Sequence, residues 1–268
     1  MKPKTSLIIS TYNKPAVLRL CLESVKAQSV LPDEIVIADD GSSEDTRELI
    51  NQYAAAFSIE VKHIWQPDNG YHLPRIQNKA LVAAKYEYII QIDGDVILHP
   101  RFVDDHLSIC RRNTFISGGR ALLDEQTTQE LITLAGSSPH IKTSRVGKKY
   151  NAIHSRILSA LNYLLQRGSR QVNYVLGCNM AFWKDDLIKI NGHNEEFIDW
   201  GKEDNDISMR LINAGVKLRF LKFGGIVYHL FHNERPMEGT SNNERLFNES
   251  RNKKITFVPN GMSQHSHP

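Results

Sequence analysis

Tyr88-Ile89-Ile90-Gln91-Ile92-Asp93-Gly94-Asp95 is the stretch of sequence that decides the fold. Its apolar run is typical of a strand buried on both faces of a parallel sheet. Asp93 and Asp95 end that strand, and Gly94 between them lets a ligand approach the backbone closely. Hard divalent cations such as Mg²⁺ and Mn²⁺ prefer oxygen ligands and bridge to phosphates. The stretch therefore indicates either a metal and phosphate site or a plain turn, because Asp and Gly are also favoured in turns.

The residues before this stretch alternate between strand and helix patterns. Strands are predicted at 6–10, 34–38, 59–64 and 88–92, and helices at 18–25, 44–57 and 73–84. This alternation predicts an α/β fold with a Rossmann-like, mainly parallel central sheet and helices on both faces. Because such sheets bind ligands beyond the carboxyl ends of their strands, three polar clusters are expected to meet there: Ser10 to Asn13, Asp39 to Ser42, and Asp93 to Asp95.

The second half of the chain is less regular. A strand is predicted over 115–123, a buried segment over 175–183, a helix over 204–214, and one or two strands over 216–230. The residues from 233 to 268 are polar and weakly patterned, and they are predicted to form a C-terminal tail that lies over the surface or is partly disordered.

The bulk composition excludes several classes of protein. The length of 268 residues and the 41% hydrophobic content suit one large α/β domain, and a net charge of +3 indicates no particular partner. Cys21, Cys110 and Cys178 form no C-x-x-C pair, so neither a zinc site nor a disulfide framework is indicated. The N-terminus lacks a signal-peptide pattern, and no stretch approaches the ~20 apolar residues that span a bilayer. A cytoplasmic protein is predicted.

A basic, amphipathic insert is predicted at 138–172. No acidic residue occurs between Glu130 and Asp185, whereas Lys and Arg are frequent there, and an apolar helical stripe runs from Ile153 to Leu165. Such a helix is expected to meet an anionic membrane surface, here the inner face of the plasma membrane, or a partner. A solvated loop with a core-packing helix is at least as good an interpretation. Nucleic acid is disfavoured as a partner, because the stripe is aliphatic and not aromatic.

The segment from Asp199 to Asp206 is rich in acids. Its carboxylates could simply complement the dipole of the helix that follows. Alternatively, one carboxylate deprotonates an acceptor hydroxyl while Trp200 offers an apolar face to a sugar ring. His229 and His232 follow an apolar run further on. Residues i and i+3 of a strand point to opposite faces, so only one of the two is expected to reach a shared metal unless the chain turns there, and His229 is favoured.

Taken together, these motifs resemble the inverting family 2 glycosyltransferases of the GT-A fold. The resemblance rests on residues 8–13, 37–42 and 91–95, the last being a D-x-D motif. The segment 199–206 further resembles the W-G-x-E-D segment of β-1,4-galactosyltransferases and bacterial chondroitin polymerases. One departure is that Asp199 stands where the galactosyltransferase pattern has the first glycine of Gly-Trp-Gly.

The resemblance implies a role for each matching residue. It implies a nucleotide-binding half at 1–100 and an acceptor-binding half at 101–232 of a single domain, and it implies transfer by one displacement with inversion at the anomeric carbon. The implied nucleotide-binding residues are Ser10, Tyr12, Asp40, Arg75 and Asp93; the metal ligands for Mn²⁺ or Mg²⁺ are Asp95 and His229; the catalytic base is Asp204; and the acceptor contacts are Trp200 and Glu203.

The function implied is metal-dependent transfer of a hexose or N-acetylhexosamine, with galactose or N-acetylgalactosamine preferred. The donor would be a UDP-sugar, and the acceptor a glycan or lipid-linked molecule in surface polysaccharide biosynthesis. A nucleotidyltransferase is the first alternative, although no glycine-rich loop follows the first strand. A non-catalytic protein that binds nucleotide-sugars or glycans is the second, although Asp95 and Asp204 are both present.

Overall fold

The computed structural model describes residues 2–134, 141, 146–147, 149–166, 168–233 and 240–266. The predicted insert at 138–172 is thus described in part. Its basic residues Lys142, Arg145, Lys148 and Arg167 lie outside the described residues.

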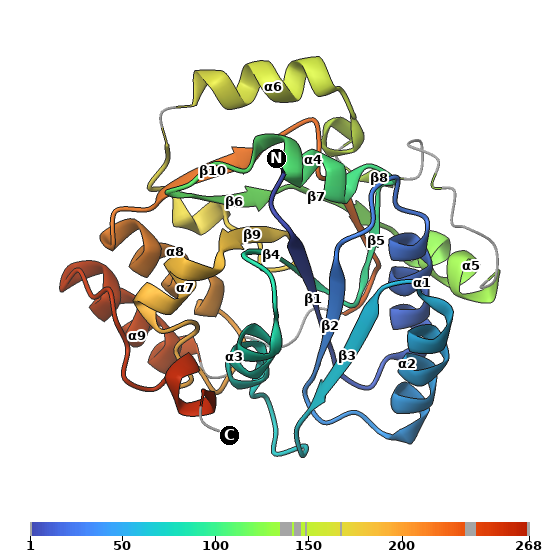
Figure 1. Ribbon diagram of the computed structural model, residues 1–268, viewed down its shortest axis with the longest axis horizontal. Coiled ribbons are helices and arrows are strands. Elements are labelled where there is room, and N and C mark those ends of the chain that lie inside the picture. Colours follow the sequence, from blue (N-terminus) through green and yellow to red (C-terminus); the bar gives the residue numbers. More distant parts are fainter. Residues whose placement is uncertain are drawn as a thin grey trace.

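A seven-stranded sheet forms the centre of the molecule, in the order β10-β6-β9-β4-β1-β2-β3 (Figure 1). β9 runs antiparallel to β4 and β6, and the other neighbours pair in parallel, so the predicted mainly parallel sheet is confirmed. The strands are β1 (Thr5–Thr11), β2 (Glu34–Asp39), β3 (Glu60–Trp65), β4 (Tyr88–Asp93), β6 (Thr114–Gly118), β9 (Met180–Trp183) and β10 (Lys217–Leu221).

Helices cover both faces of this sheet, as predicted. Because successive strand side chains point to opposite faces, Leu7 and Ile9 of β1 pack in the core under α1 (Pro15–Lys26) and α2 (Glu44–Ala56). Ile8 packs in the other core, under α3 (Leu73–Ala83), α7 (Lys184–Ile190) and α8 (Glu203–Asn213). Figure 1 shows these two groups of helices on either side of β1 and β2.

A second sheet of four strands has the order β5-β11-β7-β8. It consists of β5 (Val96–Leu98), β7 (Arg120–Leu123), β8 (Val146–Gly147) and β11 (Val227–His229). The strand predicted over 115–123 therefore divides between the two sheets at Gly118, where an added Cβ would lie 2.2 Å from the side chain of Asn179. The strands predicted over 216–230 divide likewise into β10 and β11. This division carries β11 alongside β5, directly after Asp95.

The C-terminal residues differ from the predicted tail. α9 (Thr240–Asn252) packs along α8 with Leu246 and Phe247 buried, and a 3-10 helix at Met262–His265 packs on α3. The amide of Asn191 donates to the carbonyl oxygen of Val258 at 2.7 Å. Leu246, Phe247, Val258 and Met262 are the buried apolar residues of this described segment, and they are too few for its average composition to indicate packing on the domain.

Three further helices complete the described fold: α4 (Phe102–Ile109), α5 (Glu125–Thr133) and α6 (Arg156–Leu165). In the described part of the chain, every helix is too short or too polar to cross a bilayer.

Candidate active site

The three polar clusters do meet at the carboxyl edge of the central sheet. Ser10 of β1 lies opposite Asp93 of β4, and Thr11 lies opposite Asp39 of β2. The backbone N–H of Gly94 donates to the carbonyl oxygen of Ser10 at 2.7 Å. An added Cβ on Gly94 would lie 3.0 Å from that oxygen, so glycine at this position allows the turn to pack against β1.

Asp40 faces the loop between β3 and α3. Its carboxylate accepts hydrogen bonds from the side chain of Gln66 at 2.6 Å and from the backbone of His72 at 3.0 Å. Burial raises the pKa of Asp40, while these two donors lower it. The preceding Asp39 has a structural role, because it accepts from the backbone of Ser42 and bonds to His63, each at 2.8 Å. Of the two acids, Asp40 is thus the one that faces the loop between β3 and α3, which the resemblance places near the nucleotide.

Asp68 of the same loop contacts both the cluster of Ser10 to Asn13 and the cluster of Asp39 to Ser42. The hydroxyl of Tyr12 donates to the carboxylate of Asp68 at 2.7 Å, and Tyr12 itself is half exposed. Gly41 has a φ of 98°, and an added Cβ would lie 2.6 Å from the backbone of Asp68. Glycine at 41 is therefore required for the close approach of the loop. Arg75 lies exposed in the first turn of α3, on the C-terminal side of this loop.

Asp95 lies between two histidines that arrive from β11. Nε2 of His229 lies 3.6 Å from one carboxylate oxygen of Asp95, and Nε2 of His232 lies 3.4 Å from the other. The three ligand atoms lie within 4.8 Å of one another. The carboxylate oxygen that faces His229 is buried and accepts no hydrogen bond within the described part of the chain. An unsatisfied buried oxygen beside two imidazole nitrogens fits a divalent cation.

Hydrogen bonds at Nδ1 give both histidines the tautomer that a metal needs. Nδ1 of His229 bonds to the carbonyl oxygen of Leu230 at 2.9 Å, and Nδ1 of His232 bonds to that of Asn233 at 3.0 Å. Since a carbonyl only accepts, the proton of each neutral ring sits on Nδ1. Nε2 then presents its lone pair toward Asp95, which is the arrangement usual for metal-binding histidines.

The exception foreseen in the sequence applies, because the chain turns after His229 and both imidazoles face Asp95. β11 ends at His229, and the chain has left the strand geometry by His232. The two rings come within 5.1 Å of each other, measured between centroids. The alternation of side chains that would separate them applies only within a strand.

A second cluster of the same residue types, made of His99, Asp105 and His154, has the opposite hydrogen bonding. Nδ1 of His99 accepts from the backbone N–H of Arg101 at 3.2 Å, so its proton sits on Nε2. Nε2 of His154 lies 2.9 Å from Asp105, which also accepts from the backbone of Gly225 at 2.9 Å. Nδ1 of His99 and the carboxylate of Asp105 thus already accept hydrogen bonds, and Nε2 of His154 carries the proton that it donates to Asp105.

Two further carboxylates stand at the start of α8. Glu203 is buried, and the hydroxyl of Tyr71 donates to it at 2.8 Å across 132 residues of sequence. Asp204 lies against Gly177, where an added Cβ would come within 2.1 Å of its carboxylate. α8 therefore presents both acids toward the same edge as β4, with Gly177 leaving the space that Asp204 occupies.

Burial and neighbouring carboxylates raise the pKa of two acids at this edge, Asp93 and Asp204. Burial, with the carboxylates of Asp95 and Glu203, raises the pKa of Asp93 to about 8. Burial, with the carboxylates of Glu203 and Asp93, raises the pKa of Asp204 well above its ordinary value. The cations of Arg120 and Lys14 act in the opposite direction on Asp93. Such an excess of carboxylates is the environment that a bound cation would relieve.

The loop that carries Trp200 is held from the C-terminal helix. The buried amide of Asn243 in α9 donates to the carbonyl oxygens of Asp199 at 2.8 Å and Gly201 at 2.9 Å. Trp200 between them is 42% exposed, and Gly201 has a φ of 105°. The indole is therefore available to a ligand while its backbone is fixed.

Sequence reasoning missed several of these residues. Tyr71, Asn243 and Gly177 act through contacts that join distant segments, and their local sequence carries no signal for them. Lys14, whose ammonium lies 4.0 Å from Asp95, was visible only as part of the loop after the first strand.

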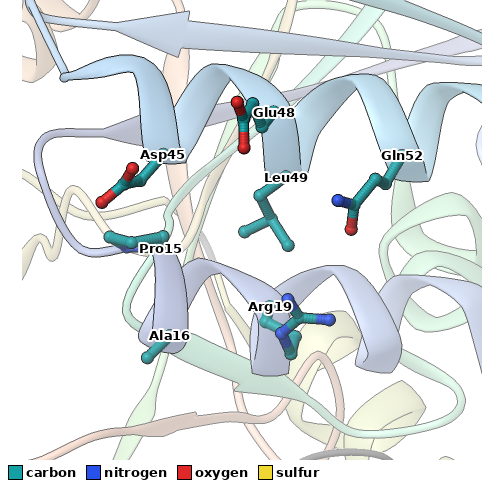
Figure 2. A pocket seen from close by; sticks show the side chains of 7 residues that line it. All are labelled: Pro15, Ala16, Arg19, Asp45, Glu48, Leu49 and Gln52. Atoms are coloured by element: carbon teal, nitrogen blue, oxygen red, sulfur yellow. The ribbon is translucent and has the colours of Figure 1, made fainter.

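A pocket between α1 and α2 lies outside this group of residues. Figure 2 shows it between the two helices, with Leu49 at its centre and Asp45, Glu48 and Arg19 around it. None of the residues that line this pocket is a predicted site residue.

Sequence comparison places this edge in a known context. Residues 6–157 match the model of "Glycosyl transferase family 2", and residues 166–233 match "N-terminal domain of galactosyltransferase". The chain is 30% identical to a chondroitin synthase of Escherichia coli over 84% of its own length and 34% of the relative. It is 29% identical to a hyaluronan synthase of Pasteurella multocida over 84% of its length and 24% of the relative. The chain thus spans about a third or less of these two synthases.

Solved structures show the same fold. A mannosyltransferase of Pyrobaculum calidifontis, in complex with GDP-Man and Mn²⁺, aligns with a TM-score of 0.60 at 15% identity, covering 89% of this chain and 59% of that one. S. aureus TarS (residues 1–349) in complex with UDP aligns with a TM-score of 0.61 at 18% identity, covering 91% and 64%. The predicted GT-A fold is confirmed.

Proposed function

This chain belongs to glycosyl transferase family 2, and on that premise we propose that it is a metal-dependent, inverting enzyme that uses a UDP-sugar donor. Family membership decides against the nucleotidyltransferase alternative. The observation that carries the metal dependence is the convergence of Asp95, His229 and His232 on one point, with both Nε2 lone pairs free.

We propose Mn²⁺ as the cation that these residues hold, in preference to Mg²⁺. Two imidazole nitrogens and one carboxylate make a mixed donor set, and imidazole suits transition metals better than it suits Mg²⁺. The bound cation would offset the charge of the departing nucleoside diphosphate. The tautomers of His229 and His232 prepare the site for it, because neither ring has to move its proton before binding.

Asp204 is the proposed catalytic base. Its raised pKa makes it a stronger base than an ordinary carboxylate once it is ionised. The carboxylate of Asp93 contributes to this rise in pKa. Asp204 would accept the proton of the acceptor hydroxyl, whose oxygen attacks the anomeric carbon as the bond to the diphosphate breaks. A single displacement of this kind inverts the configuration. Glu203 and the exposed indole of Trp200 would bind the acceptor sugar.

Ser10, Tyr12, Asp40, Arg75 and Asp93 remain the proposed nucleotide contacts. Support comes from their position along one edge, with the loop of Gln66 and Asp68 bonded to Asp40 and Tyr12. One aligned structure contains GDP-Man and the other contains UDP, so the two do not distinguish between these nucleotides. The preference for UDP therefore rests on the family resemblance of these residues. Galactose or N-acetylgalactosamine is the proposed sugar, and a glycan or lipid-linked molecule in surface polysaccharide biosynthesis is the proposed acceptor.

A thermal-shift screen of nucleotide-sugars with and without Mn²⁺ tests this function. A bound ligand well above its Kd raises Tm, so UDP-galactose or UDP-N-acetylgalactosamine is expected to raise Tm only when Mn²⁺ is present. The anomeric configuration of the product, read by NMR, then tests inversion. A shift with GDP-mannose alone would overturn the UDP assignment, and an equal shift in excess EDTA would overturn the metal dependence.

A further inference from the structure

α6 is docked on the protein with its polar side inward. The side chain of Gln166, just after the helix, exchanges two hydrogen bonds with the backbone of Phe220 in β10, at 2.7 and 2.8 Å. The guanidinium of Arg219 donates to the carbonyl oxygen of Tyr163 at 2.8 Å. Ser159 is the buried residue of the helix, and its hydroxyl faces the backbone at Gly224. Polar groups and backbone, together with the ring of Tyr163 against the core, thus make the contact that a row of aliphatic side chains makes in an ordinary surface helix.

The aliphatic side chains of α6 point away from the protein. Ile157 is 74% exposed, Leu164 is 77% exposed and Leu165 is 81% exposed. Figure 1 shows α6 at the rim of the molecule, outside α4 and β10 and on the side where the N-terminus lies. We call this surface the aliphatic ridge; its residues are Ile153, Ile157, Leu158, Leu161, Leu164 and Leu165, each at least 44% exposed. A contiguous exposed patch of this kind marks an interaction surface.

Exposed cations stand at both ends of α6. In the sequence, the chain from 131 to 184 contains no Asp or Glu and eight Lys and Arg residues. Among the described residues, Arg156 opens α6 and Arg170 follows it, and both are exposed. Lys222 is exposed beside Phe223, whose carbonyl oxygen accepts from the backbone of Ser155. The two acids of α4 are already paired, Asp104 with Lys2 and Arg101, and Asp105 with His154.

We infer that the aliphatic ridge of α6 docks this protein on an anionic lipid bilayer. A leucine-rich face inserts at the level of the lipid headgroups, and the exposed Arg156, Arg170 and Lys222 are attracted to the negative surface potential. Charge complementarity favours this occupant over a second copy of the chain, because two copies would bring like charges together. The inference does not depend on the proposed donor or metal, since α6 contacts β10 and α4 and none of the proposed site residues lies on it.

Vesicle flotation tests the docking with the whole protein. Phosphatidylcholine vesicles with phosphatidylglycerol are expected to carry the protein upward, and vesicles of phosphatidylcholine alone are not. Each Lys or Arg at the surface adds about fivefold to binding, so raising the salt concentration should release the protein. Equal binding to neutral and anionic vesicles, or no binding to either, would overturn the inference.

A pair of matched variants separates the ridge from general stickiness. Leu161→Ser with Leu164→Ser should weaken binding to anionic vesicles by at least about tenfold. Ile188→Ser with Phe257→Ser removes two apolar side chains, 51% and 54% exposed, elsewhere on the surface and should leave binding unchanged. Tm and transfer to a soluble acceptor should stay the same in both variants, which keeps this test apart from that of the proposed function.

Two results would contradict the assignment to lipid. One is unchanged vesicle binding by the Leu161 and Leu164 variant. The other is a concentration-dependent dimer, seen by light scattering, that the same variant abolishes while the original protein leaves anionic vesicles unbound. That result would show that the aliphatic ridge binds a second copy of the chain.

Discussion

Two clusters in this molecule contain the same residue types and differ in their hydrogen bonding. Asp95, His229 and His232 at the carboxyl edge of the sheet have free Nε2 lone pairs, because both Nδ1 protons are given to backbone carbonyls. In the cluster of His99, Asp105 and His154, Nδ1 of His99 and the carboxylate of Asp105 already accept hydrogen bonds, and Nε2 of His154 donates to Asp105; the two rings stack with centroids 4.3 Å apart. The difference teaches that a set of donor residues does not define a metal site. The hydrogen bond at Nδ1 sets the tautomer of each imidazole, and the tautomer determines whether Nε2 has a lone pair for a metal.

The strongest test of this contrast changes the carboxylate of each cluster in the same way. Asp95→Asn should lower kcat/KM for transfer by at least about a thousandfold, since stabilisation of the departing diphosphate by a cation amounts to several kcal/mol. Asp105→Asn should leave kcat/KM of the folded protein nearly unchanged and reduce the free energy of unfolding by about 1–3 kcal/mol, because Asp105 accepts hydrogen bonds from Gly225 and His154. Steady-state kinetics and urea unfolding measure the two effects. Equal losses of activity would show that the clusters do not differ in function.

The second test separates the metal from the base within the active edge. Asp204→Asn should lower turnover by about a hundredfold or more, because it removes the proton acceptor and keeps the shape of the side chain. Binding of UDP with Mn²⁺ should remain, since Asp204 lies on α8 and not in the Asp95 cluster. Single-turnover rates and a calorimetric titration measure the two quantities. Unchanged turnover would remove Asp204 from the role of base.

A smaller effect is expected at Tyr71, which lies in the loop between β3 and α3 and donates a hydrogen bond to Glu203. Tyr71→Phe removes one hydrogen bond to a buried carboxylate, which is worth about 1.5–3 kcal/mol, or about tenfold or more. KM for the acceptor should rise, and the Kd of the donor should change little. His72→Ala in the same loop, which keeps its backbone bond to Asp40, is the matched control. A larger effect on the donor than on the acceptor would show that Tyr71 belongs to the nucleotide site.

The smallest effect concerns the second cluster and pH. Burial and the neighbouring His154 lower the pKa of His99 to about 4, with Asp105 opposing and Arg101 adding to the shift. Below pH ~6.5, His99 binds a proton in the unfolded chain but stays neutral in the folded protein. The free energy of unfolding therefore decreases as the pH falls from ~6.5 toward 4. Between pH 7 and 5 this should cost about 1 kcal/mol after screening by solvent. His99→Asn, which can still accept from Arg101, should reduce that loss in urea unfolding; an identical pH dependence would contradict the assignment.

Local patterns in the sequence were enough to predict most of the central sheet. The buried runs of β1, β2 and β4 and their polar ends follow from hydrophobic patterning, and the parallel arrangement follows from the alternation with helices. The acids Asp93, Asp95 and Asp204 could be found because each stands in a motif. What could not be found were contacts across the chain, such as Tyr71 with Glu203 and Asn243 with the Trp200 loop. The reach of His232 depends on where β11 ends, which periodicity does not determine.

The position of α6 shows the same limit. Its stripe of Ile and Leu was equally consistent with core packing and with an outward face, since a helical period states which residues share a face and not where that face points. The backbone of β10 and the side chain of Gln166 determine the orientation.

A calorimetric titration of Mn²⁺ in the presence of UDP tests the contrast between the two clusters most directly. The variant His229→Ala with His232→Ala is compared with His99→Ala with His154→Ala, so that each cluster loses both imidazoles. The first variant should bind Mn²⁺ at least about a hundredfold more weakly than the unchanged protein, and the second should bind it with the same affinity. Undiminished binding by the first variant, or an equal loss in both, would contradict the assignment of the metal to Asp95, His229 and His232.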